Sequence, residues 1–250
     1  PHIQIFGLHS VNLTSLSTKA FKNCFKLNSL HVDGNENLTL LSSSFAEECS
    51  NLKNIYMSNN GLKTLESDAF KGLENLNYLV LSRNQLTNLP ATSFAHTPKL
   101  EFLFLDYNQI VNFHADLFYP MKKLQLLSAT SNLIELISLD IFHNKPLLHQ
   151  IFLDNNHIDA IEPDFFDEFP GKLELYEIRF YNNNCTSSAL IASKTPQEDK
   201  HYDEEKFSLC FENWYGLQQV ELEVSTEEID QSSSTLLPMG IDEFAIISFD

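Results

Sequence analysis

A unit of 24 residues recurs along most of the chain, and this repetition constrains the fold more than any other feature. The segments LKNIYMSNNGLKTLESDAFKGLEN (residues 52–75) and LEFLFLDYNQIVNFHADLFYPMKK (100–123) share the frame LxxLxLxxNxLxxLxxxxFxxxxx. The frame also fits residues 3–26, 27–51, 76–99, 124–147 and 148–169, and residues 175–185 supply a half repeat. A period of this length predicts a solenoid, in which each unit is stabilised by its neighbours.

The columns of the frame predict the structure of one unit. The segment x-L-x-L-x predicts a short strand whose leucines alternate inward, and the strands of neighbouring units are expected to pair in parallel about 4.8 Å apart. An asparagine, whose amide is both donor and acceptor, recurs in one column at Asn35, Asn60, Asn84, Asn108, Asn132, Asn156 and Asn183. A phenylalanine recurs late in the unit, at Phe21, Phe45, Phe70, Phe94, Phe118, Phe142 and Phe166. We interpret both columns as structural.

Over residues 3–185 this frame resembles the leucine-rich repeat family in its extracellular 24-residue variety. The resemblance implies an α/β fold, a right-handed curved horseshoe with a concave parallel β-sheet, and a ladder of asparagine side chains that satisfies backbone groups. The chain is similar to the ectodomains of Toll-like receptors and to secreted immune repeat proteins of insects. That similarity implies recognition in innate immunity or receptor–ligand signalling, although the heptads that often follow the insect repeats are absent.

After residue 185 the repeat ends, and FYNNNCTSSALIAS resembles the start of the C-terminal cap that closes extracellular repeat solenoids. We therefore predict a solenoid over residues 1–184 and an acidic cap or tail over 185–250. Within the cap we expect a short helix at 187–193, a loop at 195–205 and strands at 217–225 and 243–249. The family's cap commonly carries four cysteines, whereas this segment has two.

The four cysteines predict two disulfides. Cys24 and Cys49 each stand three residues before the first leucine of the next unit, so they occupy one column in adjacent coils, within the 4.4–6.8 Å that a bridge requires. A bridge from Cys24 to Cys185 would have to cross about 29 Å at strand spacing. We therefore predict Cys24–Cys49 and Cys185–Cys210. The alternatives are free thiols or a metal site, which no CxxC spacing favours.

Disulfides imply an oxidising compartment, and three glycosylation sequons agree with a secreted or extracellular location. The sequons begin at Asn12, Asn37 and Asn184. Asn12 and Asn37 follow the predicted strand, where a glycan would be exposed, while Asn184 stands beside the bridged Cys185. Because the chain begins at Pro1 without a leader, we interpret it as a mature or trimmed chain.

The charge balance is strongly acidic, with a net charge of −18 and only 16 dispersed lysines and arginines. This composition argues against nucleic-acid binding and anionic membranes, and no apolar run is long enough for membrane insertion. Residues 186–250 hold 14 acidic and 3 basic residues, a net charge of −11. The charge indicates either solubility alone or a basic protein partner steered by the electrostatic field.

No motif points to catalysis. GxSxG, P-loop and GxGxxG sequences are absent, so we predict neither an enzyme nor a cofactor. His9 and His31 are expected on the strand face of adjacent coils with Asp33 nearby, which leaves a pH-sensitive or metal-binding pair open. We favour an ordinary solvated pair and predict no metal, because no third ligand is expected beside it.

The outward strand positions are left to carry function. Apolar side chains collect there at Tyr56, Tyr78, Val80, Phe102, Phe104, Leu126 and Phe152. A polar rim is expected from Asp33, Arg83, Asp106, Tyr107, Asp154 and Arg179. Aromatic anchors inside a polar rim are typical of protein-binding surfaces, so we predict a protein partner on the concave face. Three alternatives stay open: stabilisation of the sheet itself, a small-molecule or lipid ligand, and a self-contact, either through homodimerisation as an adhesion or structural protein or through the segment FAIISF.

Overall fold

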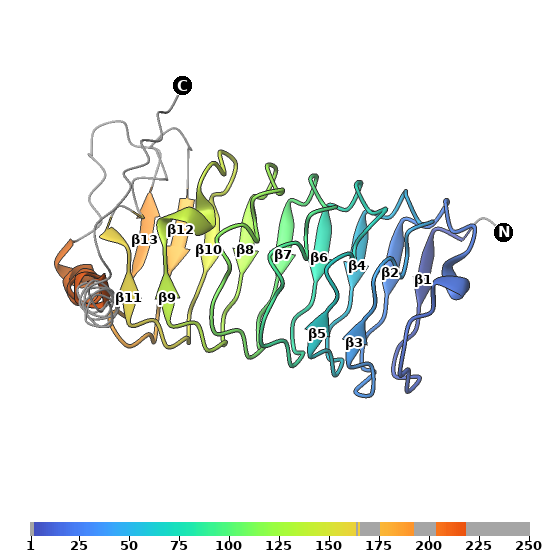
Figure 1. The fold of residues 1–250 in the computed structure, drawn as a ribbon, viewed down its shortest axis with the longest axis horizontal. Helices are drawn as coiled ribbons and strands as arrows, with labels where there is room; N and C mark the ends of the chain where they lie inside the picture. Colours follow the sequence, from blue (N-terminus) through green and yellow to red (C-terminus); the bar gives the residue numbers. More distant parts are fainter. Residues whose placement is uncertain (1–2, 164, 166–175, 193–203, 219–250) are drawn as a thin grey trace, which may run out of the picture.

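The computed structural model describes residues 3–163, 165, 176–192 and 204–218, and it shows a solenoid of stacked coils (Figure 1). Each coil contributes one short strand to a single nine-stranded sheet. In sheet order its strands are β1 (Ile5–Gly7), β2 (Ser29–His31), β4 (Asn54–Tyr56), β6 (Tyr78–Val80), β7 (Phe102–Phe104), β8 (Leu126–Ser128), β10 (Gln150–Phe152), β12 (Tyr176–Arg179) and β13 (Ala189–Ala192). The first eight strands pair in parallel, as the repeat predicts.

The LxL leucines form the core because they point inward from each strand. Central strand residues such as Leu79, Leu103 and Leu127 are fully buried, while their neighbours on either side lie on the sheet surface. The first strand differs, since its central residue Phe6 is 38% exposed. Burial of leucine side chains contributes roughly 1.5–3 kcal/mol each, so the stacked coils hold one another together.

The opposite side of the solenoid is built from short elements. Two small parallel sheets lie there, β3 (Leu40–Leu41) with β5 (Thr64–Leu65) and β9 (Leu136–Ile137) with β11 (Ala160–Ile161). Two 3₁₀ helices, η1 (Thr18–Phe21) and η2 (Leu139–Phe142), precede the turn back to the sheet. Tight 3₁₀ turns suit these narrow coils, and helix is therefore scarce among the described residues.

Phenylalanines stack behind the sheet from coil to coil. The rings form two series in which neighbouring centroids are separated by 5.8–6.5 Å. One series contains Phe21, Phe45, Phe70 and Phe94, and the other contains Phe118, Phe142 and Phe165. Phe165 is fully buried in the seventh coil, where the sequence pattern had indicated Phe166, which lies outside the described residues. The adjacent Phe165 thus continues the stack in this coil.

The asparagine column forms a buried ladder between coils. The Asn108 side chain accepts a hydrogen bond from the Leu86 N–H at 3.1 Å and donates to the carbonyl oxygens of Leu81 and Leu105 at 3.0 and 2.8 Å. Asn84 and Asn132 make the same set of contacts in the neighbouring coils. Each amide thus satisfies backbone groups that the turn out of the strand would leave buried and unpaired.

Both predicted disulfides are present. Cys24 and Cys49 are bridged with their Cα atoms 4.8 Å apart, and Cys185 and Cys210 are bridged with a Cα separation of 5.0 Å. No described cysteine is free. The second bridge ties the end of the last repeat to the helical segment that begins with η4 (Glu204–Phe207) and continues through residues 208–218.

Two expectations for the C-terminal region are corrected. Residues 189–192, within the predicted helix, form β13, which pairs antiparallel with β12 and ends the sheet. Residues 217 and 218, at the start of the predicted strand 217–225, lie in the helical segment. The remainder of that strand, most of the loop predicted at 195–205 and the strand predicted at 243–249 lie outside the described residues.

The phenylalanine stack continues into this end of the molecule. Phe165 contacts Phe180, and Phe180 contacts Phe207 of η4 at a centroid distance of 5.8 Å. Both Phe180 and Phe207 are almost fully buried. The helical segment therefore covers apolar side chains that the last coil would otherwise expose.

Candidate binding face

We use the term strand face for the surface formed by the outward side chains of the nine-stranded sheet. The strand register places Tyr78 opposite Phe102 and Val80 opposite Phe104. Phe102 and Phe104 lie opposite Leu126 and Ser128 in turn. The two outward positions of each strand thus form two rows that run across the coils.

Aromatic rings are in contact along one half of the strand face. Tyr56 of β4 lies 5.4 Å from Tyr78 of β6, measured between ring centroids. Tyr78 lies 5.7 Å from Phe102 and 5.2 Å from Phe104, both on β7. We call these four residues the aromatic row; all of them are half-buried and keep one side toward solvent.

The aromatic row continues toward the N-terminus through His31. The imidazole of His31 stacks on Tyr56 with a centroid distance of 4.4 Å and an interplanar angle of 17°. Burial raises the pKa of the Tyr78 hydroxyl, and the nearby Tyr56 adds to that rise. Tyr78 is therefore neutral at physiological pH, and its ring enters the row as an uncharged amphipathic surface.

Phe152 stands apart from the aromatic row. Ser128 lies between Phe104 and Phe152 in the register, and it is buried, with its hydroxyl hydrogen-bonded to Asp106. The guanidinium of Arg179 lies 3.9 Å above the Phe152 ring in a cation–π contact. The structure thus places Phe152 on the same face as the row, but beneath an arginine.

Arg179 also links Phe152 to the acidic residues at this end of the face. Its Nε lies 3.1 Å from Asp154 Oδ2 and 3.9 Å from Glu177 Oε1. Burial raises the pKa of the Asp154 carboxyl, and hydrogen bonding from the Tyr181 N–H together with the charge of Arg179 opposes part of that rise. This cluster of Phe152, Asp154, Glu177 and Arg179 is therefore partly satisfied within the chain.

The acidic residues of the expected rim have a structural role that the sequence pattern did not indicate. Asp33, Asp106 and Asp154 share one column, and each accepts the backbone N–H of the residue in that column of the next coil. The backbone nitrogens of Ser58, Thr130 and Tyr181 lie 2.7, 2.9 and 3.0 Å from the Oδ1 atoms of these aspartates, in the same order. A carboxylate after the strand in several coils is the signal that would have revealed these bonds.

A second column missed in the sequence consists of residues with left-handed backbone. It follows the aspartate column and contains Ser10, Gly34, Asn59, Arg83, Tyr107, Ser131, Asn155 and Asn182, with φ between 51° and 73°. Glycine and asparagine tolerate this conformation, whereas bulky side chains adopt it at a cost. Arg83 and Tyr107 are the two large members, and the Arg83 guanidinium lies 4.4 Å above the Tyr107 ring, which is 50% exposed.

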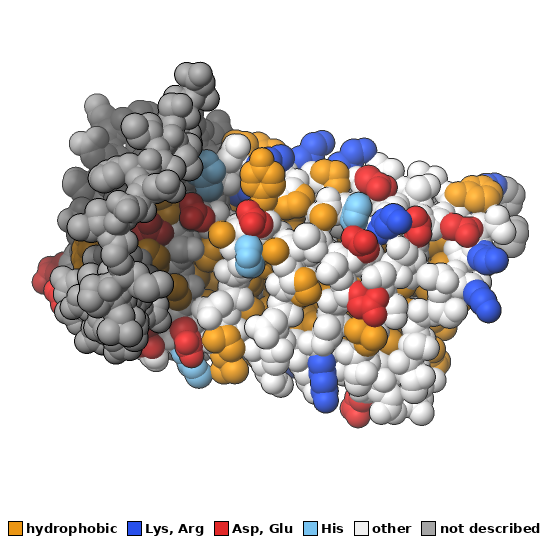
Figure 2. All heavy atoms as spheres, in the orientation of Figure 1, with side chains coloured by type: hydrophobic (Ala, Val, Ile, Leu, Met, Phe, Trp, Pro, Cys, Tyr) orange, Lys and Arg blue, Asp and Glu red, His pale blue; other side chains and the backbone are white. Residues whose placement is uncertain are grey.

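One broad side of the solenoid carries mixed charge. Figure 2 shows one broad side of the solenoid, on which acidic, basic and hydrophobic side chains are interspersed along the coils.

Of the sequon asparagines, Asn12 and Asn37 are exposed and hydrogen-bonded to each other. Asn184 is exposed as well, but Thr186 of its sequon is buried and donates to the Lys206 carbonyl.

Stacked coils of 24 residues with one parallel strand each, an asparagine ladder and a phenylalanine stack define a class of repeat solenoids. The family described as leucine rich repeat matches residues 50–110, and the family described as BspA type leucine rich repeat region matches residues 87–189. The chain belongs to the leucine-rich repeat proteins, whose repeats indicate a protein-interaction module. A comparison with curated proteins finds no match. No helix in the described ranges is long and apolar enough to cross a membrane.

Proposed function

We propose that this chain is a non-catalytic extracellular recognition protein that binds a protein partner through the strand face. The aromatic row of Tyr56, Tyr78, Phe102 and Phe104 is the observation that carries this proposal. Recognition in innate immunity or in receptor–ligand signalling is the setting that the resemblance to extracellular repeat proteins suggests.

The row suits a protein partner because its rings are already ordered. Ring-to-ring contacts fix Tyr78 and Phe104 in the free protein, so binding would cost little side-chain entropy. Covering a half-buried aromatic ring removes further apolar area from water, at about 25 cal/mol per Å². An open, shallow row of this kind does not enclose a small molecule as ligand pockets do, which disfavours a lipid or small-molecule carrier.

Tyr107 and Arg83 support a rim contact at the edge of the row. Both side chains stand in a left-handed column where asparagine occurs in other coils, and a non-glycine residue there costs roughly 1–2 kcal/mol. Local strain of this kind is concentrated at functional sites. We include Asp106, Leu126, Phe152, Asp154 and Arg179 in the contact area, as flanking residues rather than anchors.

The net charge of −18 favours a basic partner, since complementary fields accelerate encounter. The association rate is then expected to fall as ionic strength rises from 0.05 to 0.5 M, because salt screens exposed charges over about 10 Å at 0.1 M. Affinity is expected to change less than the association rate, because the aromatic row is uncharged.

The extracellular assignment rests on the two disulfides and on the exposed sequons at Asn12 and Asn37. After expression through a secretory pathway, we expect glycans on Asn12 and Asn37 and none on Asn184, because the Thr186 hydroxyl is buried and bonded. Intact-mass measurement before and after enzymatic deglycosylation, followed by peptide mapping, counts and locates the glycans. A glycan on Asn184 with none on the other two would contradict this choice of sequons, and no glycan on any of the three would remove the sequons from the argument for an extracellular location.

The experiment that tests the function is an affinity capture from extracellular fluid with quantitative mass spectrometry. The double variant Phe104→Asp with Phe152→Asp is expected to lose the captured partner. The matched control is Tyr119→Asp, which changes an aromatic residue that is 62% exposed and lies late in its coil, outside the strand face. Equal capture of the partner protein by the wild type and by the double variant would contradict the proposal.

Two further measurements separate the alternatives. A mass measurement in solution distinguishes a monomer from a homodimer built on the strand face. Native mass spectrometry reports lipid that co-purifies with the chain. A dimer or a bound lipid that is lost in the Phe104→Asp and Phe152→Asp double variant would replace the partner hypothesis with the corresponding alternative.

A further inference from the structure

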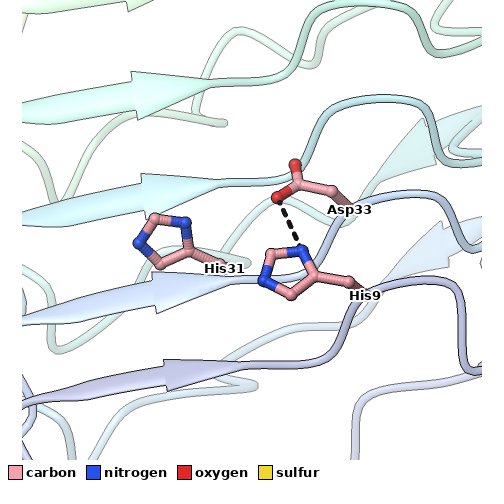
Figure 3. Close-up of side chains that lie close together, drawn as sticks. All are labelled: His9, His31 and Asp33. Carbon is pink, nitrogen blue, oxygen red and sulfur yellow. Dashed lines mark ion pairs between the residues drawn. The ribbon is translucent and has the colours of Figure 1, made fainter.

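Two histidines and an aspartate meet at the N-terminal end of the strand face (Figure 3). His31 comes from the end of β2, while His9 and Asp33 follow the strands β1 and β2. One potential ligand atom from each of the three residues lies within 4.8 Å of the other two. Among the residues that the structure describes, no other group of three histidine, cysteine or acidic side chains meets this condition.

Backbone pairing holds the three residues in place. The Leu8 N–H donates to the His31 carbonyl at 2.8 Å, and the Ser10 N–H donates to the Asp33 carbonyl at 2.9 Å. These bonds fix the main chain on both sides of His9 relative to the two residues of the next coil. The cluster is therefore set by the register of the solenoid rather than by a flexible loop.

Neighbouring groups orient each side chain. The Ser58 N–H donates to Asp33 Oδ1 at 2.7 Å, which leaves Oδ2 facing His9 Nδ1 at 3.4 Å. His31 Nε2 lies 3.0 Å from Ser29 Oγ, and Tyr56 stacks against the ring. Figure 3 shows the other nitrogen of the His31 ring on the side of Asp33. Hydrogen bonds of this kind orient ligands in metal sites and fix the tautomer of a ligating histidine.

Gly7 makes room for the imidazole of His9. A Cβ atom at this position would lie 2.8 Å from His9 Nε2 and 3.2 Å from His9 Cδ2, closer than atoms pack. The outward position of β1 that carries a side chain in the other strands is thus empty, and the His9 ring occupies the space. This cradle brings the ring over the sheet, with its centroid 5.9 Å from that of His31.

We propose that His9, His31 and Asp33 form a site for a divalent transition-metal ion of the zinc type. Two imidazoles and one carboxylate are a ligand set that such ions take, whereas Ca²⁺ and Mg²⁺ require mainly oxygen ligands. In a tetrahedral zinc site, ligand atoms lie about 3.3 Å apart, and His9 Nδ1 and Asp33 Oδ2 are 3.4 Å apart. The three ligand atoms lie within 4.8 Å of one another. To reach the separation of about 3.3 Å in a tetrahedral site, no pair of them has to approach by more than about 1.5 Å.

The solvent side of the three ligands is open, since the His9 side chain is 60% exposed. An ion held here keeps at least one coordination position for water or for a donor atom of another molecule. The site borders the aromatic row through the stack of His31 on Tyr56. The proposal stands independently of partner binding, and metal alone tests it.

The test is isothermal titration calorimetry of the whole chain with Zn²⁺ after treatment with a chelator. The wild type is expected to bind one equivalent, with a rise in melting temperature when Zn²⁺ is present. His9→Ala and Asp33→Asn are each expected to weaken binding at least about tenfold. The asparagine can still accept the hydrogen bond from the Ser58 N–H, so the metal-free Asp33→Asn protein is expected to melt close to the wild type.

Two further variants sharpen the result. Gly7→Ala keeps all three ligands, but its methyl group displaces the His9 ring, so it is expected to weaken Zn²⁺ binding without unfolding the chain. His96→Ala is the matched control, because His96 and Asp68 form an exposed pair at 3.3 Å that does not belong to a group of three, and it is expected to bind Zn²⁺ like the wild type. The proposal is overturned if the wild type binds no stoichiometric Zn²⁺. It is equally overturned if His9→Ala and Asp33→Asn bind as the wild type does, or if His96→Ala loses as much affinity as they do.

Discussion

At the scale of single residues, one buried amide holds two coils together. Asn108 is 7% exposed, and its side chain serves the Leu86 N–H and the carbonyl oxygens of Leu81 and Leu105. The Leu86 N–H depends on this amide, whereas the Leu81 and Leu105 carbonyl oxygens also accept hydrogen bonds from Asn84 and Asn132 in the neighbouring coils. The column is therefore a structural requirement of the fold, and it carries no information about the ligand.

Asn108→Ala is expected to lower the free energy of unfolding by about 1–3 kcal/mol, because it leaves the buried Leu86 N–H without an acceptor and removes one of the bonds to the Leu81 and Leu105 carbonyl oxygens. Chemical denaturation measured by circular dichroism checks this value. The neighbouring variant Gln109→Ala is the control, since Gln109 is exposed, and it is expected to stay within about 0.5 kcal/mol of the wild type. A loss below 1 kcal/mol in Asn108→Ala would show that water replaces the ladder.

Lys145 is a buried residue whose charge works against folding. It is 7% exposed and occupies the column that holds Cys24, Cys49, Leu73, Thr97 and Met121 in the preceding coils. Burial lowers the pKa of the Lys145 ammonium to about 8, and the nearby Lys122 adds to this effect. Its Nζ donates to the His143 carbonyl at 3.0 Å, which offsets part of the cost of burial.

The pKa of Lys145 gives the stability of the chain a defined pH dependence. Between pH 8 and about 10.4 the unfolded chain binds a proton at this lysine and the folded chain does not, so stability rises with pH, on the order of 1 kcal/mol per unit. Lys145→Met, which introduces the residue of the preceding coil, is expected to abolish this rise and to stabilise the chain at pH 7. Denaturation curves from pH 7 to 9.5 that run parallel in both proteins would contradict the assignment.

At the scale of elements, the 24-residue period predicts the strands and register that recur in every coil, but it does not predict pairings that occur once. The frame predicted the outward neighbours of Phe104 correctly, because a fixed period fixes the strand register. For the seventh coil the frame indicates Phe166, which lies outside the described residues, and the structure buries the adjacent Phe165. The frame failed at residues 189–192, because the pairing of β13 with β12 is made between segments that no repeat relates.

The candidate sites show the same limit. The outward columns could be read from the repeat, and so could the neighbourhood of His9 and His31. Asp33 was expected nearby as well, but the space at Gly7 that the His9 ring occupies was not foreseen, because it depends on how the side chains pack. The sequence likewise did not reveal that Arg179 covers Phe152, because the direction of a long, flexible side chain depends on its surroundings in the folded structure.

The C-terminal helical segment is attached to the last coils by a disulfide, a ring contact and hydrogen bonds, among them the one from Thr186 to the Lys206 carbonyl. The Cys185–Cys210 bridge, the Phe180–Phe207 ring contact and a hydrogen bond of 2.7 Å from Asn213 to the Asp159 carbonyl attach it to the last coils. The cysteines of this bridge are 25 residues apart, as are those of Cys24–Cys49. The two bridges are therefore equivalent in loop length but differ in what they attach.

Replacing both cysteines of the second bridge, Cys185→Ser with Cys210→Ser, is expected to destabilise the chain by about 3 kcal/mol and to reduce amide protection in residues 204–218. The matched control is Cys24→Ser with Cys49→Ser, which opens a loop of the same length and is expected to leave that protection intact. Hydrogen–deuterium exchange measures both. Equal loss of protection in the two variants would mean that the bridge does not anchor the helical segment.

At the scale of the whole molecule, the inward side of the sheet accounts for stability, and we propose that the outward side accounts for recognition. Inward leucines, the phenylalanine stack and the asparagine ladder account for folding, and each depends on the adjacent coil. The outward side is left to carry the aromatic row near its middle, with the proposed metal site at its N-terminal end and the Arg179 cluster toward its C-terminal end. A variant within the aromatic row is thus expected to change binding with little effect on folding, whereas the outward aspartates also bond the backbone of the next coil.

The most direct test of the binding role is photo-crosslinking from the centre of the aromatic row. Phe104 is replaced by the photoreactive amino acid p-benzoylphenylalanine, and Tyr119 is replaced in the same way as a control outside the strand face. On irradiation in extracellular fluid, we expect the probe at 104 to form a covalent product with a distinct protein, and the probe at 119 to form no such product. Capture of that protein from 119 and not from 104, or a product at 104 that contains only a second copy of the chain, would contradict recognition of a protein partner through the strand face.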